Sequence, residues 1–301
     1  MSNVSLSISD QVRSAFDFTV DKFPLSGPEN LPTDQYGLFR SDTGYIKGVT
    51  SVTKRYVPPS TDDVCALVEA AENTFDGDIS VQTHWRKGHY VTVAPTQAER
   101  ASIYGTEDNI FPRIVIRAGY DGQAFTGTMG YYRDACSNLA MMNRVAGTCT
   151  KIRHTSGLRS LMDQLIQQFG ELHKGWQHLV QVAREMQSRE VRMIEFLNEI
   201  YGVPSEEQLA LARTGQRVRS VTAHQNRTEM IWKRLNRERV RTGRPVLTGD
   251  TVSAWEAYNS IQGYVQHDAQ AKSSHSSEFD RILRAANDPN VRKAERLALA
   301  V

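Results

Sequence analysis

The sequence has little of what marks secreted, disulfide-bonded or membrane-spanning proteins. Its 301 residues include three cysteines, Cys65, Cys136 and Cys149, an odd and sparse set that argues against a disulfide framework. No run of about 18 apolar residues occurs, so we expect no membrane span. The first residues lack the basic start and apolar stretch of a secretory signal. These absences predict a cytoplasmic protein.

The motifs of several enzyme classes are also missing. There is no Gly-x-x-x-x-Gly-Lys-Ser/Thr loop for a P-loop ATPase, and no Gly-x-Gly-x-x-Gly turn for a dinucleotide. A Gly-x-Ser-x-Gly elbow is absent, and acidic residues do not cluster in the spacing of a two-metal nuclease. We therefore expect no cofactor and no bound metal, and the sequence favours a protein that is not an enzyme.

Charge is distributed unevenly along the chain. Residues 1–150 hold 13 Lys and Arg against 17 Asp and Glu, whereas residues 151–301 hold 23 against 17. Between Arg213 and Arg244 there are ten basic and two acidic residues, a local charge of +8. Such a segment attracts polyanions, but a solvated helix face has the same composition, so both interpretations stay open.

The hydrophobic pattern changes once along the chain. Short alternating runs occupy residues 36–133, with one short helix over 61–73, whereas apolar residues recur every three or four positions from residue 156. We expect an α+β fold, with an antiparallel sheet domain over 1–155 and a helical region over 156–301. Hairpin turns are expected at 41–44, 86–88 and 121–122. The expected later helices are a long amphipathic one from 158 to about 201, one capped by Ser205 and Gln208, an exposed basic one over 216–242, one around Trp255, and two short terminal ones.

The Asp121-Gly122 hairpin predicts two chemically different faces. Alternation puts Ile114, Ile116, Ala118, Phe125, Met129 and Tyr131 on a core face, and Arg113, Val115, Arg117, Thr126, Thr128 and Tyr132 on the other. Arginines on a sheet face can follow a phosphate backbone, and a tyrosine there can stack on a base. The simpler interpretation is an ordinary solvent face of an antiparallel sheet.

The expected turn at 86–88 brings aromatic and cationic residues together. Trp85 and Tyr90 flank Arg86 and Lys87 there, a combination suited to contacts with single strands. Alternatively, the two aromatic residues anchor the hairpin while the two cations lie in water.

Three motifs in order resemble one known family. Phe-Thr-Gly-Thr-Met-Gly-Tyr-Tyr-Arg-Asp-Ala-Cys-Ser-Asn at 125–138 is followed by Ile-Arg-His-Thr at 152–155. Upstream, Tyr-Gly-Leu-Phe-Arg at 36–40 leads to Tyr-Val-Pro at 56–58, and Trp-Glu-Ala-Tyr-Asn stands at 255–259. This order resembles a phage- and plasmid-like family known as domain of unknown function 932, over about residues 35–270. The family often has an Asn-Ser-His-Asp-Gly turn, which this chain replaces with Arg-Ala-Gly-Tyr-Asp-Gly at 117–122. The resemblance implies no activity, but it implies a setting on mobile elements, beside DNA-handling proteins.

One possible catalytic pair and one possible metal site remain. Cys136 and His154 could act as nucleophile and base, or they could be structural residues at the junction of sheet and helix. Cys136, Cys149 and His154 could bind zinc with His84 or His89, although no Cys-x-x-Cys supports this.

Three functions follow from these patterns. The first is a phage- or mobile-element-encoded protein that binds or anneals single-stranded DNA in recombination or replication, plausibly as a homo-oligomer. The second is an anti-defence or anti-restriction protein that binds a host protein, and the third is an enzyme that uses Cys136 and His154. For the first function, the residues expected to contact nucleic acid are Trp85, Arg86, Lys87, Tyr90, Arg113, Arg117, Tyr132, Arg133, Arg153, Arg234, Arg237 and Arg241.

Overall fold

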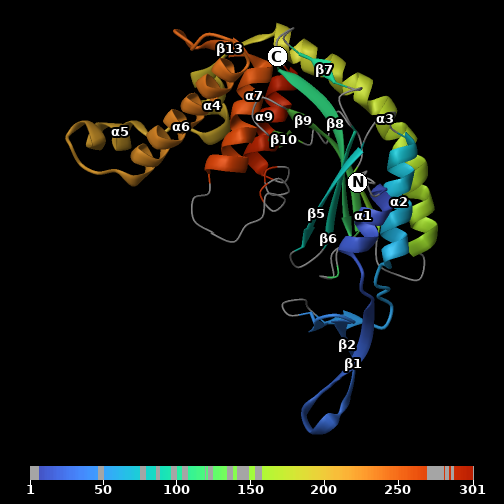
Figure 1. Ribbon diagram of the computed structural model, residues 1–301. Coiled ribbons are helices and arrows are strands. Elements are labelled where there is room, and N and C mark those ends of the chain that lie inside the picture. Colours follow the sequence, from blue (N-terminus) through green and yellow to red (C-terminus); the bar gives the residue numbers. More distant parts are fainter. Residues whose placement is uncertain are drawn as a thin grey trace, which may run out of the picture. The chain divides into compact units, whose positions relative to one another are not determined.

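A computed structural model of the chain shows an α+β fold, as the sequence pattern predicts. It describes residues 7–46, 51–74, 79–85, 89–95, 100–103, 108–118, 120, 125–133, 138–140, 149–152, 158–269, 281, 285 and 288–300. Antiparallel strands dominate the N-terminal part and helices the C-terminal part (Figure 1). Among the described helices, none has the length and apolar character needed to cross a bilayer.

The chain forms two compact units, and each is built from three separate segments. Unit 1 comprises residues 1–100, 111–130 and 143–177, and unit 2 comprises 101–110, 131–142 and 178–301. The units do not coincide with the ranges expected from the sequence, 1–155 and 156–301. The reason is that β8 (Asn109–Ala118), β9 (Phe125–Arg133) and α3 (Leu158–Ser188) each contribute residues to both units.

Unit 1 contains a small sheet with its own core. Strand β2 (Pro32–Arg40) pairs with β1 (Val20–Ser26), β3 (Gly44–Tyr45) and β4 (Val52–Thr53), and the expected hairpin turn at 41–44 joins β2 to β3. Its core holds Leu38, Ile46, Val52, Tyr56 and Tyr120. The Tyr120 hydroxyl donates to the Pro59 carbonyl oxygen at 2.8 Å, which gives this buried polar group a partner.

A larger sheet, with the strand order β10-β9-β8-β6-β5, supplies the other strands of unit 1. Its strands are β5 (Ile79–Trp85), β6 (His89–Pro95), β8 and β9, with β11 (Cys149–Ile152) paired to β9; β7 (Ala101–Ser102) and β10 (Asn138–Ala140) extend it in unit 2. Strands β5 and β6 pair antiparallel with Trp85 opposite His89, as the expected hairpin requires, while residues 86–88 lie outside the described part. At the turn expected over 121–122, β8 and β9 are hydrogen-bonded neighbours, while residues 121–124 lie outside the described part.

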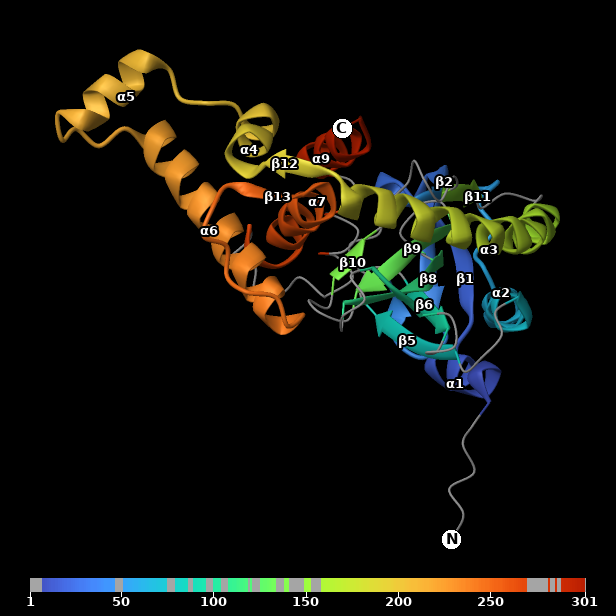
Figure 2. The ribbon, with the colours of Figure 1, turned by 90° about the horizontal axis from the view of Figure 1, so that it is seen from above.

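Helices cover one face of this sheet in unit 1. Helix α1 (Ile8–Ala15) contacts β5, and α2 (Thr61–Thr74), expected over 61–73, contacts β6. In both ribbon views α2 and the first part of α3 lie on the same side of β5, β6 and β8 (Figure 1 and Figure 2). The buried residues of α1 and α2 are Val12, Val64, Cys65, Leu67, Val68 and Ala71, so these helices present an apolar surface.

Unit 2 is built around one buried helix. All ten residues of α7 (Ala254–Gly263) are buried, and α7 contacts α6 (Arg219–Arg241) and α9 (Pro289–Ala300). Its first turn carries a capping box between Ser253 and Glu256, and a π-helical turn (Tyr264–Asp268) follows its end. The remaining helices of unit 2 that have described bounds are α4 (Met193–Tyr201) and α5 (Glu206–Arg213), and α5 has the capping box expected from Ser205 and Gln208.

The long helix is shorter than expected. We predicted that it runs from 158 to about 201, but α3 ends at Ser188 and α4 begins at Met193. The intervening β12 (Glu190–Arg192) pairs antiparallel with β13 (Thr251–Ser253). A pairing with a strand about 60 residues away therefore breaks a segment whose own composition favours a helix.

Candidate nucleic-acid interface

A row of polar positions crosses three strands of the larger sheet in unit 1. The register pairs His84 of β5 with Tyr90 of β6, and Tyr90 with Arg117 of β8. Directly paired residues of antiparallel strands share a face, with Cβ atoms about 4.5–5.5 Å apart. The three positions therefore form one line across the sheet, occupied by a histidine, a tyrosine and an arginine.

The same face continues with mostly polar positions. The next row contains Gln82, Thr92 and Val115. Strand β9 is a neighbour of β8, and in it Tyr131 and Arg133 are buried while Tyr132 is half-buried, so the even-numbered positions of β9 are its less buried side. Two such positions pair with β11, Thr126 with Lys151 and Thr128 with Cys149.

The alternate positions of the same strands are mostly apolar residues. Their paired rows are Val81–Val93–Ile114, Thr83–Val91–Ile116 and Trp85–His89–Ala118. The expected division of β8 into a core side with Ile114, Ile116 and Ala118 and a polar side with Arg113 and Arg117 agrees with this register.

The register separates two expected contact residues by position. Trp85 pairs with His89, whereas Tyr90 pairs with His84. Paired rows alternate between the two faces of a sheet, so these two rows belong to different faces. The contact role of Trp85 stays a prediction, and the row that contains Tyr90 is considered below. Of the other expected residues, Arg86, Lys87 and Arg153 lie outside the described part, as do Cys136 and His154.

The expected contact set omits one member of the polar row, His84. The signal for His84 is present in the sequence, because the expected hairpin predicts which residue of β5 is paired with Tyr90.

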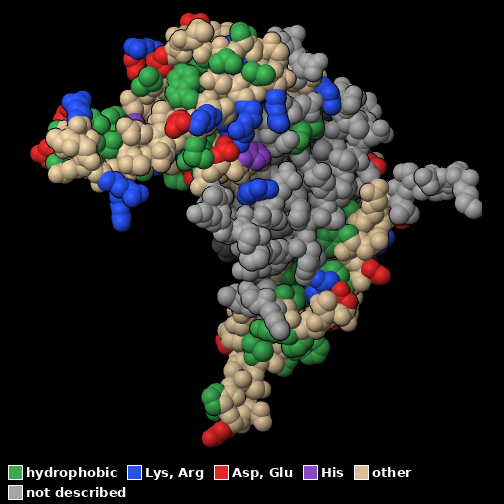
Figure 3. Space-filling model, turned by 60° about the vertical axis from the view of Figure 1, so that its left-hand side comes forward, with side chains coloured by type: hydrophobic (Ala, Val, Ile, Leu, Met, Phe, Trp, Pro, Cys, Tyr) green, Lys and Arg blue, Asp and Glu red, His purple; other side chains and the backbone are tan. Residues whose placement is uncertain are grey.

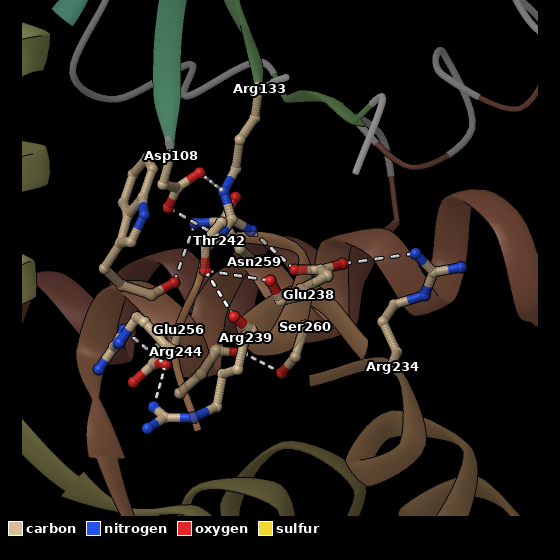
Figure 4. A network of polar contacts seen from close by, with 12 residues as sticks. Asp108, Arg133, Arg234, Glu238, Arg239, Thr242, Arg244, Glu256, Asn259 and Ser260 are labelled. Carbon is tan, nitrogen blue, oxygen red and sulfur yellow. Dashed lines mark hydrogen bonds and ion pairs between the residues drawn. The ribbon is translucent and has the colours of Figure 1, made fainter. Parts of the chain in front are cut away.

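Arg133, a second expected contact residue, lies in a buried ionic network of unit 2 (Figure 4). Its guanidinium donates from Nε and Nη2 to the two carboxylate oxygens of Asp108 at 2.6 and 2.8 Å. Its Nη1 donates to Glu238 Oε2 at 2.7 Å. Arg133 is 2% exposed and Asp108 is fully buried. A guanidinium held in this way cannot reach a phosphate in solution, so the expected role of Arg133 is wrong.

The network continues along α6 and includes Arg234, a third expected contact residue. Arg234 is 6% exposed, its Nη1 lies 3.4 Å from Glu238 Oε1, and its Nε donates to Asp268. Burial raises the pKa of Glu238, an effect that the charges of Arg133 and Arg234 oppose. Arg234 therefore balances a buried carboxylate, and we remove it from the interface as well.

A second branch of polar contacts links α6 to α7. Glu256 accepts hydrogen bonds from Arg239 and from Arg244 Nη1, the latter at 2.7 Å (Figure 4). Nearby, the Tyr131 hydroxyl donates to Asn259 Oδ1 at 3.0 Å, and the Tyr131 ring centroid lies 5.2 Å from that of Trp255. These contacts are structural: they join strand β9 and helices α6 and α7 within unit 2.

The exposed part of the basic helix is smaller than expected. Of the three α6 arginines predicted to contact nucleic acid, Arg237 and Arg241 are exposed and Arg234 is not. Figure 3 shows Lys and Arg side chains gathered on one face, with a few acidic side chains and a histidine among them. The exposed surface of α6 therefore has fewer positive charges than the composition of the segment indicates.

His267, in the π-helical turn, lies beside this network. Burial, together with the charges of Arg234 and Arg281, lowers the pKa of its imidazole to about 4, against the opposing effect of Asp268. The imidazole is therefore neutral at pH 7. Within the described part of the chain, no three His, Cys, Asp or Glu side chains are grouped as metal ligands.

Comparison with known proteins identifies the same family as the sequence motifs. A family model described as Domain of unknown function (DUF932) matches residues 49–297. No curated protein and no solved structure matches the chain.

Proposed function

The chain belongs to the DUF932 family, whose description specifies no activity, and from its own residues we propose that it binds single-stranded nucleic acid. The observation that carries this proposal is the row His84–Tyr90–Arg117 on the polar face of the larger sheet. Proteins that bind single strands without sequence specificity combine an aromatic ring, which stacks on a base, with a cation that contacts a phosphate.

The composition of the face supports a single strand rather than a duplex. Bases stack on an aromatic ring only where they are unpaired, and Tyr90 lies between His84 and Arg117 in the row. Arg113 is at a position of the same strand face as Arg117, two strand repeats or about 13 Å away, so the two positions can serve different phosphates of an extended strand.

The finer form of the proposal concerns biological setting. Annealing of complementary strands in recombination or replication, on a phage or other mobile element and in the cytoplasm, fits a surface that holds bases without a nucleotide cofactor. An anti-restriction protein would instead need a host-protein partner. An enzyme would need Cys136 and His154, which lie outside the described residues.

The test is fluorescence anisotropy with a labelled oligo-dT and a matched duplex, measured across a salt series. The double variant Arg113→Ala/Arg117→Ala removes two phosphate contacts, so the slope of log K against log salt should fall by about 1.4. Lys54→Ala/Arg55→Ala is the matched control, because it removes two exposed cations of unit 1 outside the larger sheet. An equal effect of both double variants would reduce the proposal to general charge attraction.

Tyr90 provides the second arm of this test. Tyr90→Ala should weaken binding of the single strand about 5- to 150-fold, the range of one stacked base, while Tyr90→Phe should keep the affinity because the ring remains. Circular dichroism establishes that each variant is folded. Unchanged affinity of folded Tyr90→Ala would refute stacking on this row, and absence of any binding by the wild-type chain would refute the function.

The exposed arginines of α6 are tested separately. If this helix adds phosphate contacts, Arg237→Ala/Arg241→Ala should lower the salt slope without loss of stability, because both residues are exposed. An unchanged slope would limit the interface to the sheet.

A further inference from the structure

The exposed side of helix α6 forms one continuous stripe. The helix has 23 residues, which makes it about 35 Å long, and its exposed positions recur every three or four residues. At about 100° per residue, eight of these positions lie within about 60° of a single line along the helix. The members of this α6 stripe are Arg219, Ala223, Asn226, Met230, Lys233, Arg237, Val240 and Arg241. The stripe therefore has four cations and no carboxylate.

Arginines on the rest of α6 are neutralised by carboxylates of the same unit. Arg234 forms ion pairs with Glu238 and Asp268, and Arg239 forms one with Glu256. Each of these arginines is buried or half-buried, so its charge needs a partner inside the fold.

The cations of the α6 stripe are balanced less completely. Lys233 pairs with Glu229, an exposed residue at the edge of the stripe. Within the part of the chain that the structure describes, Arg219 and Arg237 have no carboxylate partner. In both ribbon views the first turns of α6 project away from α4, α7 and α9, so this end of the helix is clear of those three helices (Figure 1 and Figure 2). Excess positive charge therefore faces the solvent along α6.

Stability of the helix does not explain these charges. Arg219 stands in the first turn, where the helix dipole disfavours a cation. Lys233, Arg237 and Arg241 follow one another at a spacing of four residues, at which like charges destabilise a helix. Only Arg241, in the last turn, gains from the dipole. The distribution is that of a surface which receives its counter-charges from a ligand.

We propose that the α6 stripe binds the phosphate backbone of duplex nucleic acid. Arg219 and Arg237 are about 27 Å apart along the helix axis, and a duplex has phosphates at regular intervals over that length. A duplex is stiff on this scale, so cations at both ends of a straight stripe can meet phosphates without ordering a flexible chain. The helix has one tryptophan, Trp232, which is half-buried and off the stripe, so no indole ring is offered for an unpaired base to stack on. This site is separate from the proposed single-strand row and does not depend on it.

The test is the salt dependence of binding to a labelled mixed-sequence duplex, measured by fluorescence anisotropy with the full chain. Arg237→Ala/Arg241→Ala removes two phosphate contacts, so the slope of log K against log salt should fall by about 1.8, and Arg219→Ala should lower it by about 0.9. The matched control is Arg292→Ala/Arg296→Ala, which removes two exposed arginines at the same spacing from α9 of the same unit and should leave the slope unchanged. Circular dichroism establishes that each variant is folded.

Two further ligands separate this proposal from its alternatives. With oligo-dT, Arg237→Ala/Arg241→Ala should keep the wild-type slope, and Arg113→Ala/Arg117→Ala should keep the wild-type slope with the duplex. Failure of the duplex site and failure of the single-strand row are thereby distinguishable. Vesicles of phosphatidylcholine and phosphatidylserine, in a co-sedimentation assay, test whether an anionic lipid surface is the ligand instead.

Four results would overturn the duplex site. They are absence of duplex binding by the wild-type chain, equal slopes for the α6 and α9 double variants, an equal loss of slope with oligo-dT and duplex, and vesicle binding that depends on Arg237 and Arg241 while duplex binding does not.

Discussion

Arg133→Met is the most informative single substitution for unit 2. It removes a bidentate contact to Asp108 at 2.6 and 2.8 Å and a contact to Glu238 at 2.7 Å, all between side chains that are at most 5% exposed. Breaking a buried pair by deleting one partner typically costs about 3–5 kcal/mol, because the remaining charge stays desolvated. Against a total stability of about 5–15 kcal/mol, the loss is large.

The distribution of this loss between the two carboxylates follows from the geometry. Glu238 keeps Arg234 at 3.4 Å, whereas Asp108 loses the two guanidinium hydrogen bonds described above. We therefore expect Arg133→Met/Asp108→Asn to recover part of the stability, because the added change removes the buried carboxylate charge that the Arg133 guanidinium had balanced. Urea unfolding, followed by circular dichroism and tryptophan fluorescence, measures both variants.

Arg237→Met is the matched control, because it shortens an exposed arginine of α6 and should change the stability by no more than about 0.5 kcal/mol. A loss below about 1 kcal/mol for Arg133→Met would refute the buried network. If single-strand affinity fell while stability did not, Arg133 would belong to the interface, as the sequence alone had suggested.

Two further predictions concern titration and a buried hydrogen bond in unit 2. The His267 pKa is about 4 in the folded chain and near 6.5 when unfolded, so the unfolded state takes up the proton first and stability falls as the pH drops from 6.5 to 4. After allowance for the partial exposure of the imidazole, His267→Gln should reduce this loss of unfolding free energy by about 1–2 kcal/mol. Urea unfolding of variant and wild type at several pH values between 6.5 and 4 measures the difference. An equal loss of stability in the two proteins would contradict a lowered pKa of His267. Tyr131→Phe should cost about 1–3 kcal/mol, because Asn259 Oδ1 loses its donor at 3.0 Å. Tyr45→Phe, at an exposed tyrosine, should cost nothing, and equal midpoints for both variants would show that the Tyr131 bond is unimportant.

Local signals in the sequence predicted much of the fold. The Arg-Lys-Gly motif at 86–88 predicted the hairpin of β5 and β6, and the register of these strands decides which of their residues share a face. The capping pair Ser205 and Gln208 marked the start of α5 correctly. Such features depend on residues close in the chain, so a single sequence contains the information.

The errors at the candidate site had signals that were overlooked. In β9 the expected core positions include Phe125, Met129 and Tyr131, and Arg133 has the same parity, so alternation already assigned it to the buried face. In α6, Ile231 and Leu235 are buried, and Arg234 and Glu238 follow them at helical spacing on the same face. For Arg133 and Arg234, position along the strand or helix predicts burial better than residue type does.

Other features could not be read from the sequence. Pairing of β12 with β13 joins residues about 60 apart, and the partners of Arg133 lie 25 and 105 residues away. No local pattern specifies which distant carboxylate a given arginine will meet, because that choice depends on how the helices and strands pack.

The separation of Arg133 from Glu238 has a consequence for synthesis on the ribosome. At about 5–20 residues per second, Arg133 leaves the peptidyl-transferase centre roughly 5–20 s before Glu238 has been translated. Asp108 and Arg133 can meet during that interval, but the third member of the network does not yet exist. Unit 2 also needs α9, near the end of the described chain, to pack against α7. The ionic core of unit 2 is therefore incomplete until Glu238 has been translated, and α7 lacks its partner helix until α9 has followed.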